Sequence, residues 1–279
     1  MILIADSGST KTSWCLTDGI DFTVYCSTGG LNPFFRSTGN IVDEIQLKLL
    51  PKTGTNIDQI FFYGAGIINP EKGDIVKNAL HKLYPKAKIE VQSDLLAAAR
   101  STLGNEKGIA CILGTGSNSC LYNGMEIVEH VPPLGFILGD EGSGSVLGRK
   151  LVGDFLKGVM PKNISEEFQN RFQITYADFM EGVYKNEKPN QFLAQFVPFI
   201  HENISTEYCV HLVENSFQEF INRNISMYSG FREQDLSFVG SVAYYFQTQL
   251  KNVLNKNQLR LKTVLKEPLN GLLKFHTEK

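Results

Sequence analysis

Residues 112–119 read ILGTGSNS, and this stretch decides the fold that the sequence predicts. The apolar residues 109–113 indicate a strand, and a second short strand follows at 118–122. Between them, Gly114-Thr115-Gly116 predicts a tight turn. Glycine tolerates positive φ and the close approach of other groups, so the backbone N–H groups of this turn can point toward one anion.

The chain opens with a second copy of this arrangement. Residues 1–5 predict an apolar strand, the small residues 6–10 a turn, and 11–17 the return strand. Each turn carries glycine and hydroxyl side chains at its tip. The pair predicts two loops that hold one polyphosphate from opposite sides.

The elements predicted after each hairpin follow the same order in both halves. Further strands are predicted at 22–26, 59–63, 88–91, 125–130, 236–239 and 259–265. Helices are predicted at 41–50, 75–84, 95–103, 241–254 and from 269. Asn123-Gly124 indicates a type I′ hairpin between 118–122 and 125–130. We therefore predict an α/β protein of two duplicated lobes, each with three antiparallel strands followed by alternating helices and strands.

The duplication predicts where the lobes divide. We place the N-terminal lobe at 1–106 and the C-terminal lobe at 107–279, and a last helix at 269–277 can pack on either lobe. Residues 146–229 interrupt the second copy with helices rich in phenylalanine. This insert is compatible with an ordinary core and with one face of a homodimer, and both alternatives stay open.

Composition excludes several classes of function. The 279 residues are 42% hydrophobic and 20% charged, with a net charge of −2, so no strongly basic surface for nucleic acid or anionic membrane is expected. No stretch approaches the ~20 apolar residues of a membrane span, and the N-terminus lacks the basic region of a signal peptide. The five cysteines form no CxxC pair, and the histidines show no HExxH spacing. We expect a cytoplasmic protein with reduced thiols and no metal site made by protein side chains alone.

Four motifs together carry a resemblance. In chain order they are DSGSTKT at 6–12, SDLLAAA at 93–99, LGTGSNS at 113–119 and LGDEGSG at 138–144. They resemble the first phosphate, connecting, second phosphate and sugar-loop motifs of the superfamily of sugar kinases, actin and heat-shock chaperone ATPases. Within it, the chain is most similar to the N-acetylglucosamine kinase-like members of the BadF/BadG-type ATPase family. The resemblance covers essentially the whole chain and implies two ribonuclease H-like lobes with an ATP and substrate cleft between them.

The first candidate site binds ATP and Mg²⁺. Asp6 follows a buried strand, which suits a carboxylate that holds Mg²⁺ through water, and the resemblance implies the same role; a turn cap is the alternative. The phosphates of ATP are expected to face the two loops, which contribute Gly8, Ser9, Thr10, Lys11, Gly114, Thr115 and Gly116. Gly240-Ser241 resembles the adenosine motif, in which the family usually has two glycines.

Asp94 is the candidate general base. It lies before a helix, where a carboxylate that caps the helix N-terminus is the default interpretation. The resemblance implies a different role, because the matching aspartate of sugar kinases accepts the proton of the attacking hydroxyl. An aspartate is ionised at pH 7 without any special shift of its pKa.

The candidate sugar-binding residues come from two loops besides Asp94 and Thr115. By resemblance, Asn32 hydrogen-bonds sugar hydroxyls, although it also suits a turn before a proline. Gly135 and Asp140 belong to the other sugar loop, and Asp140 is the expected ligand. Glu141 is expected to support it or to cap the following helix.

The resemblance implies an ATP-dependent kinase that phosphorylates the 6-hydroxyl of N-acetylglucosamine or a related amino sugar. The alternative is an ATPase activator of a 2-hydroxyacyl-CoA dehydratase-type enzyme, which carries an iron–sulfur cluster on cysteines presented between two subunits. Cys111 and Cys120 flank the second turn within core strands, which argues against the activator. The identity of the acceptor sugar stays open.

Overall fold

The structure is a computed structural model that describes residues 1–278. The chain forms two compact units, residues 1–106 together with the C-terminal residues from Glu267, and residues 107–266. Each unit contains one five-stranded mixed sheet.

The first unit is built on a sheet with the order β3-β2-β1-β4-β5. Its strands are β1 Ile2–Ser7, β2 Lys11–Thr17, β3 Thr23–Gly29, β4 Gln59–Gly64 and β5 Lys88–Ser93. The first three pair antiparallel, whereas β4 and β5 run parallel to β1. Its helices are α1 Thr38–Lys48, α2 Leu50–Thr53, α3 Pro70–Leu83, α4 Asp94–Leu103 and α14 Leu269–Thr277.

Helices cover both faces of this sheet because side chains alternate along each strand. Ile60 and Phe62 of β4 belong to the hydrophobic core that also holds Ile41 of α1. The intervening Phe61 and Tyr63 point the other way, where they contact His276 of α14.

The second unit repeats the topology with the order β8-β7-β6-β9-β10. Its strands are β6 Gly108–Leu113, β7 Ser117–Tyr122, β8 Ile127–His130, β9 Asp235–Val239 and β10 Arg260–Leu265. Three antiparallel strands again precede two that are parallel to the first. The predicted duplication of an α/β lobe is therefore confirmed.

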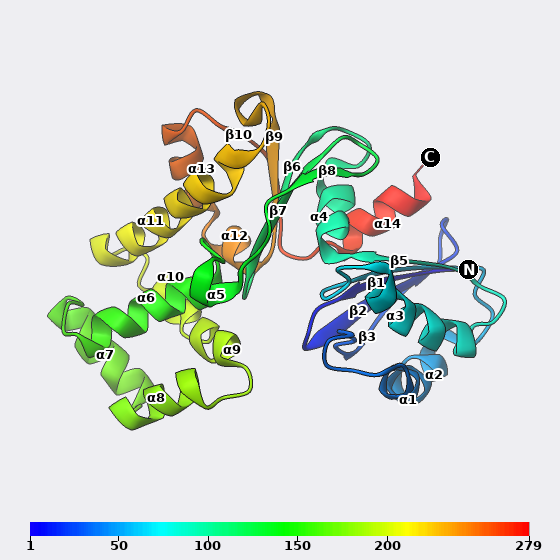
Figure 1. The fold of residues 1–279 in the computed structure, drawn as a ribbon, viewed down its shortest axis with the longest axis horizontal. Helices are drawn as coiled ribbons and strands as arrows, with labels where there is room; N and C mark the ends of the chain where they lie inside the picture. The colour runs from blue at the N-terminus through cyan, green and yellow to red at the C-terminus, as the bar shows by residue number, and fades with distance from the viewer. Residues whose placement is uncertain (279) are drawn as a thin grey trace. The chain divides into compact units, whose positions relative to one another are not determined.

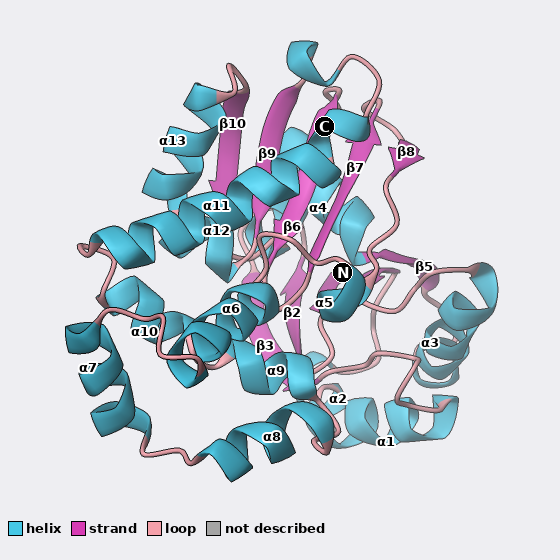
Figure 2. Cartoon of the chain, turned by 60° about the vertical axis from the view of Figure 1, so that its left-hand side comes forward, coloured by secondary structure: helices cyan, strands magenta, loops and turns pink. Residues whose placement is uncertain are grey.

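The helices between β8 and β9 make the largest core of this unit. They are α5 Gly135–Leu138, α6 Gly144–Leu156, α7 Lys162–Phe172, α8 Tyr176–Tyr184, α9 Pro189–Ala194, α10 Val197–Glu202 and α11 Glu207–Arg223, followed by two short 3₁₀ turns. Phe168 contacts the rings of Phe155, Phe179, Phe196 and Phe199, and the last three are fully buried. These phenylalanines fill an ordinary core, the first of the two alternatives. Figure 2 shows α11 crossing in front of the sheet.

The last helix belongs to the first unit. Figure 1 shows α14, in red, beside α4, and the two helices pack against each other. Gly271 allows this approach, because a Cβ there would lie 2.3 Å from the carbonyl oxygen of Ser101. The segment 269–277, left open between the lobes, thus packs on the N-terminal one.

Two predicted elements differ from the structure. The β7–β8 connection is a four-residue loop, 123–126, and not a two-residue type I′ turn, because the Asn123 side chain accepts the N–H groups of Met125 and Glu126 at 2.9 Å each. The helix predicted at 241–254 is two helices, α12 Ser241–Tyr245 and α13 Gln247–Lys256. The break falls at the fully buried Phe246.

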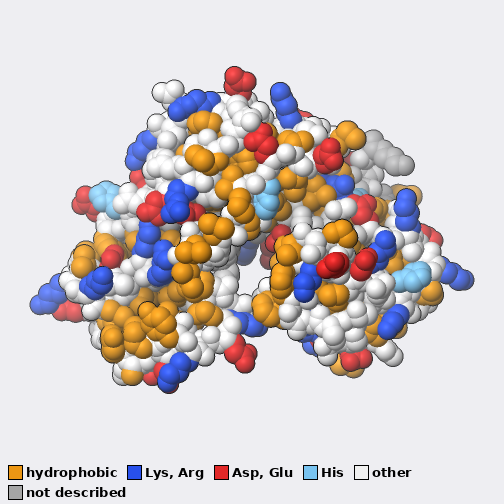
Figure 3. All heavy atoms as spheres, in the orientation of Figure 1, with side chains coloured by type: hydrophobic (Ala, Val, Ile, Leu, Met, Phe, Trp, Pro, Cys, Tyr) orange, Lys and Arg blue, Asp and Glu red, His pale blue; other side chains and the backbone are white. Residues whose placement is uncertain are grey.

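The surface carries charges of both signs. Figure 3 shows Lys and Arg side chains interspersed with Asp and Glu over the visible face, in keeping with the net charge of −2. Hydrophobic side chains also reach the surface of the insert helices (Figure 3), among them Tyr176 and Tyr184 of α8. Among residues 1–278, no helix is both long enough and apolar enough to span a bilayer.

Candidate functional site

The first candidate phosphate loop is a three-residue turn, Gly8 to Thr10, between β1 and β2. The Gly8 N–H donates to the carbonyl of Lys11 at 2.9 Å. All of Gly8, Ser9, Thr10 and Lys11 are exposed. Buried Thr12 bonds the Ser7 hydroxyl at 2.8 Å, so it holds the hairpin together and takes no part in the exposed surface.

The segment after β3 holds this loop in place. The Gly30 N–H donates to the carbonyl of Thr10 at 2.9 Å. A Cβ at Gly30 would lie 2.5 Å from the Gly8 carbonyl oxygen, so only glycine permits the contact. Asn32 donates from Nδ2 to the Ser9 hydroxyl at 2.9 Å, which joins a candidate sugar ligand to the phosphate loop.

Asn32 is largely used within its own loop. Its side chain is 6% exposed, and its Oδ1 accepts the Phe34 N–H at 2.9 Å. This is the turn arrangement that its position before Pro33 allowed. The Asn32 side-chain amide has a second N–H besides the one that donates to Ser9.

Asp6 lies within β1 and not in the turn, since it pairs with Ser13 of β2 and Tyr63 of β4. The turn-cap alternative is therefore wrong. The pKa of Asp6 is raised to about 7, mainly by burial and also by the negative charges of Asp94 and Glu267. Lys11 opposes them. A cation beside Asp6 would lower this pKa again, so the position suits a carboxylate that faces Mg²⁺.

Asp94 is the first residue of α4 and does not cap it. Ser93 is the N-cap, and its hydroxyl accepts the Leu96 N–H at 3.2 Å. The capping interpretation of Asp94 is wrong for this reason. Burial raises the pKa of Asp94, while a hydrogen bond from the Leu95 N–H lowers it. The expectation of an unshifted aspartate is thus also wrong, because the carboxyl is partly withdrawn from water.

The second candidate loop, Gly114 to Gly116, joins β6 and β7 and matches the first in length. Its carbonyls at Gly114 and Thr115 accept the N–H groups of Gly144 and Ser145, at 2.8 and 3.0 Å. Both donors lie at the start of α6. Gly114 and Gly116 do not have a positive φ, so the tolerance of glycine for positive φ does not explain their presence in this turn. A Cβ at Gly114 would meet no protein atom within 4 Å, so the space beside the loop is open.

Asp140 lies beside this loop. Its carboxylate accepts the Ser117 N–H, and a Cβ at Gly116 would approach its Oδ2 to 3.0 Å. Burial raises its pKa, as does the neighbouring charge of Glu141. The residue has a left-handed φ of 56°, which is costly outside glycine and fixes the direction of its side chain.

The other residues of the sugar loop have separate tasks. Gly135 begins α5 with a φ of 72°. Glu141 is 7% exposed and binds Arg223 at 3.0 Å and Asn224 at 3.2 Å. It does not cap α6, because Ser143 is the N-cap. Glu141 therefore ties the loop to α11, and Asp140 keeps the accessible carboxylate.

Gly240 and Ser241 join β9 to α12. Gly240 has a φ of 122°, and a Cβ there would lie 2.3 Å from the Leu113 carbonyl oxygen. Its requirement for glycine thus arises from packing of the protein itself. Ser241 is exposed and opens α12.

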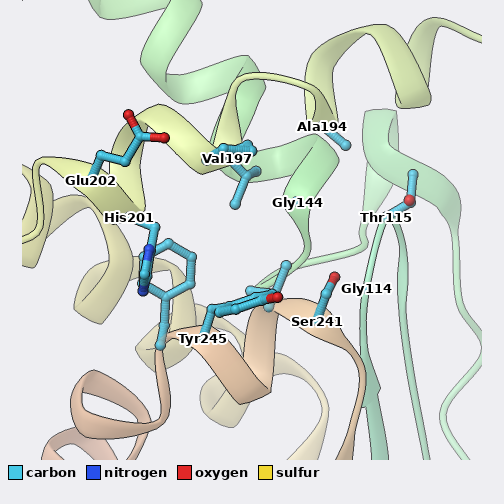
Figure 4. A pocket seen from close by; sticks show the side chains of 12 residues that line it. Gly114, Thr115, Gly144, Ala194, Val197, His201, Glu202, Ser241 and Tyr245 are labelled. Carbon is cyan, nitrogen blue, oxygen red and sulfur yellow. The ribbon is translucent and has the colours of Figure 1, made fainter. Parts of the chain in front are cut away.

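A cavity of about 350 Å³ lies within the second unit, and both Thr115 of the second candidate loop and Ser241 line it. Figure 4 shows Thr115 and Ser241 at one end and His201 and Glu202 at the other, with Tyr245 between them. Helices α9, α10 and α12 supply most of the wall, through Ala194, Val197, Pro198, His201, Glu202, Val242, Tyr245 and Phe246. The cavity has the size of a small-molecule site and a largely apolar lining.

Sequence reasoning missed the insert side of this cavity. The sequence left the insert open between an ordinary core and a dimer face, yet its helix α10 brings His201 to the aromatic ring of Tyr245, with 5.4 Å between centroids. The available signal was the exposed pair Tyr244-Tyr245 directly after the adenosine motif. The structure thus brings Thr115 and Ser241 together in the second unit, and Asp6 and Asp94 in the first.

A crystal structure from Porphyromonas gingivalis, of a protein named "Putative N-acetylglucosamine Kinase", is similar over the whole chain. It is 43% identical, with 100% of this chain and 99% of that chain covered and a TM-score of 0.95. The chain belongs to the N-acetylglucosamine kinase-like family.

More distant structures share the fold alone. A protein of the same name from Chromobacterium violaceum is 16% identical, covers 98% of each chain and has a TM-score of 0.76. A glucokinase from Streptomyces griseus, solved with glucose and AMPPNP, is 14% identical over 98% of this chain and 97% of that one, with a TM-score of 0.55. The chain therefore shares its fold with both structures even at this low sequence identity. No protein-family model matches the sequence, and no match is found among curated proteins.

Proposed function

We propose that the protein is an ATP-dependent kinase that phosphorylates the 6-hydroxyl of N-acetylglucosamine or a related amino sugar. The observation that carries this proposal is the placement of Asp94, a partly buried carboxylate at the start of α4 whose helix is capped by another residue. The similarity to the protein from Porphyromonas gingivalis supports the substrate class.

Phosphoryl transfer depends mainly on positioning and charge. We assign the backbone N–H groups and hydroxyls of Gly8 to Thr10, together with Lys11, to one side of the ATP phosphates, and Gly114 to Gly116 to the other. The open space beside Gly114 supports this assignment. The adenosine then occupies the cavity that runs from Thr115 and Ser241 toward His201.

Asp6 is the residue that would hold Mg²⁺, through water. The bound ion neutralises charge on the phosphates. Because the pKa of Asp6 is raised to about 7, a nearby cation would favour its ionised form. Lys11 is the nearby positive charge that already opposes the shift.

Asp94 accepts the proton of the sugar 6-hydroxyl as its oxygen attacks the γ-phosphorus. The bond between the γ-phosphorus and the bridging oxygen breaks, and ADP leaves. Burial of Asp94 raises its pKa, which strengthens it as a base provided that it stays ionised. Asp140 and the remaining N–H of Asn32 are proposed to bind sugar hydroxyls.

The activator ATPase is the weaker candidate. Its cluster needs cysteine thiolates at an accessible surface. Cys111 and Cys120 are fully buried in β6 and β7, and burial raises the pKa of Cys120 to about 12. Such thiols are poor ligands because the thiolate is the form that binds metal.

A coupled assay of ADP release tests the proposal. Purified protein is supplied with ATP and Mg²⁺ and, in turn, N-acetylglucosamine, glucosamine, N-acetylmannosamine, an anhydro-sugar and glucose. We expect the highest kcat/KM with an N-acetylated amino sugar, and a product phosphorylated at the 6-position. ADP release that no sugar stimulates would refute the kinase assignment.

A further inference from the structure

The far end of the cavity in the second unit is built in an unusual way. Two of its polar side chains, Glu202 and Tyr245, are already bonded to other residues of the protein. Both carboxylate oxygens of Glu202 bind the guanidinium of Arg171, one of them at 3.1 Å. The Tyr245 hydroxyl accepts a hydrogen bond from Lys266 at 2.8 Å.

The rest of the wall at this end is mostly apolar and has few groups that could hydrogen-bond a ligand. Val197, Val242 and Phe246 are apolar, and Pro198 has no N–H to donate. The Phe246 N–H donates to the Val242 carbonyl at 3.1 Å. His201 is the exception, since within residues 1–278 its ring makes aromatic contacts with Tyr245 and Phe246 but no hydrogen bond.

We propose that this pocket selects the nucleotide by shape and aromatic contact, so that it accepts guanine as well as adenine and favours purines over pyrimidines. The inference rests on the proposed function, because it assumes that the cavity beside Thr115 and Ser241 holds the base of the phosphate donor. It goes further by assigning the choice of base to the insert helix α10 and to α12.

The physical reason lies in what separates the two purines. Adenine carries an exocyclic amino donor where guanine carries a carbonyl acceptor. A site that hydrogen-bonds this edge rejects the wrong base by about 10⁴–10⁵-fold, because its buried polar groups are left unpaired. An apolar pocket discriminates by only about 10–200-fold. Glu202 is paired with Arg171 and the Tyr245 hydroxyl already accepts from Lys266, so only the Tyr245 hydroxyl proton and the His201 ring are left to bond a base at this end. We therefore place this pocket in the second class, and His201→Phe tests the part of that assignment that concerns His201.

Tyr245 contributes the contact common to all bases. Its ring lies in the middle of the cavity (Figure 4) and is 47% exposed. Removal of the ring therefore leaves the fold intact. A purine covers more of an aromatic face than a pyrimidine does, so purines gain more from this residue.

Calorimetric titration of the whole protein with ADP, GDP and UDP, in the presence of Mg²⁺, tests the inference. We expect the Kd values for ADP and GDP to differ by less than about 200-fold, with UDP weaker than both. Tyr245→Leu should weaken ADP and GDP about equally, by roughly tenfold. His201→Phe keeps the aromatic contacts and should leave the ADP to GDP ratio unchanged.

The outcomes separate the inference from the function. A preference for ADP over GDP beyond about 200-fold, or a change of that ratio in His201→Phe, overturns shape selection even if sugar phosphorylation is intact. Similar affinities without any sugar phosphorylation would refute the kinase and uphold the base pocket. Absence of binding by all three nucleotides, or equal binding of UDP and ADP, refutes the pocket assignment.

Discussion

At the scale of single residues, Ser93 and Asp94 are neighbours with different roles at the start of α4. Ser93 accepts the Leu96 N–H and so leaves the carboxylate of Asp94 available. Sequence reasoning favoured Asp94 as the base through the resemblance, but the local pattern alone made Asp94 the default cap, because serine and aspartate are equally good N-caps and lie side by side. Only the backbone conformation of Ser93, with φ −71° and ψ 154°, distinguishes them.

This pair gives the first prediction. Asp94→Asn keeps the shape but loses the base, so turnover on the best sugar should fall by about 10²–10⁴-fold with ADP affinity nearly unchanged. Ser93→Ala is the matched control: it should cost about 1 kcal/mol of stability and spare most of the rate. Steady-state kinetics and thermal melts of both variants check this. If Asp94→Asn retains more than a tenth of wild-type turnover, Asp94 is not the base.

Two glycines in candidate nucleotide motifs are required for different reasons, which gives the second prediction. Gly240→Ala forces a Cβ against the Leu113 carbonyl at a φ of 122°, so we expect a loss of about 2 kcal/mol or more in the free energy of unfolding. Gly114→Ala meets no protein atom and should change stability by less than about 1 kcal/mol. Its ADP affinity should nevertheless fall, because the methyl group occupies the space assigned to phosphate. Denaturant unfolding and ADP titration of both variants provide the test, and unchanged ADP affinity in Gly114→Ala would contradict the clamp.

At the scale of elements, periodicity predicted nearly every strand and helix of both sheets, since apolar alternation is a local property. It failed where side chains act on the backbone. Asn123 lengthened the β7–β8 loop, and the buried Phe246 divided one helix into two. The contacts that hold the two phosphate loops, from Gly30 and from the start of α6, join distant segments and have no local signal in the sequence.

The contact of α14 with the first unit is sensitive to pH. His276 stacks on Phe61 with 3.7 Å between ring centroids, and its Nε2 bonds the Tyr63 hydroxyl at 2.9 Å. The pKa of His276 is lowered to about 4, mainly by burial and also by the positive charge of Arg100, against the opposing charge of Glu90. The folded protein therefore holds this histidine neutral.

The third prediction follows by linkage. Below its usual pKa of 6.5 the unfolded chain binds a proton that the folded chain rejects. The stability contributed by the neutral His276 is therefore complete above pH 6.5 and is lost as the pH falls toward 4, by roughly 1–2 kcal/mol because the ring is partly exposed to solvent. His276→Phe keeps the stacking and removes the titration. The stability difference between wild type and this variant should thus shift in favour of the variant on acidification.

Chemical denaturation at pH 7.5, 6 and 5 measures that difference. The comparison must be between variants, because the raised pKa of Asp6 favours the folded state at acid pH and acts in the opposite direction. His211→Gln, on the exposed surface of α11, is the control and should follow the wild type. A constant difference between wild type and His276→Phe at all three pH values would contradict the prediction.

At the scale of the whole molecule, the sequence predicted the internal duplication but not the lobe on which the last helix packs. In the second copy α14 occupies the place in chain order that α4 holds in the first, yet it packs on α4. Its amphipathic pattern indicates that one face of the helix is buried, but it does not indicate which lobe that face packs against. The chain consequently passes between the units twice, at 106/107 and at 266/267.

The fourth prediction concerns these two crossings. The candidate groups are divided, with Asp6 and Asp94 in the first unit and the second loop and its cavity in the other. The proposed in-line transfer requires the attacking sugar oxygen to lie about 3–3.5 Å from the γ-phosphorus, with the candidate groups arranged around one substrate pair. Substrates that contact both units favour a closed arrangement, and hinge motion in kinases is absorbed by a few connecting residues.

We therefore expect the radius of gyration from small-angle scattering to decrease when N-acetylglucosamine and a non-hydrolysable ATP analogue are both bound. Asp94→Asn should still close, because it retains an acceptor oxygen for the sugar, whereas a sugar that the enzyme does not phosphorylate should leave the radius unchanged. An unchanged radius at saturation with both ligands would mean that the reacting groups do not assemble by movement of the two units.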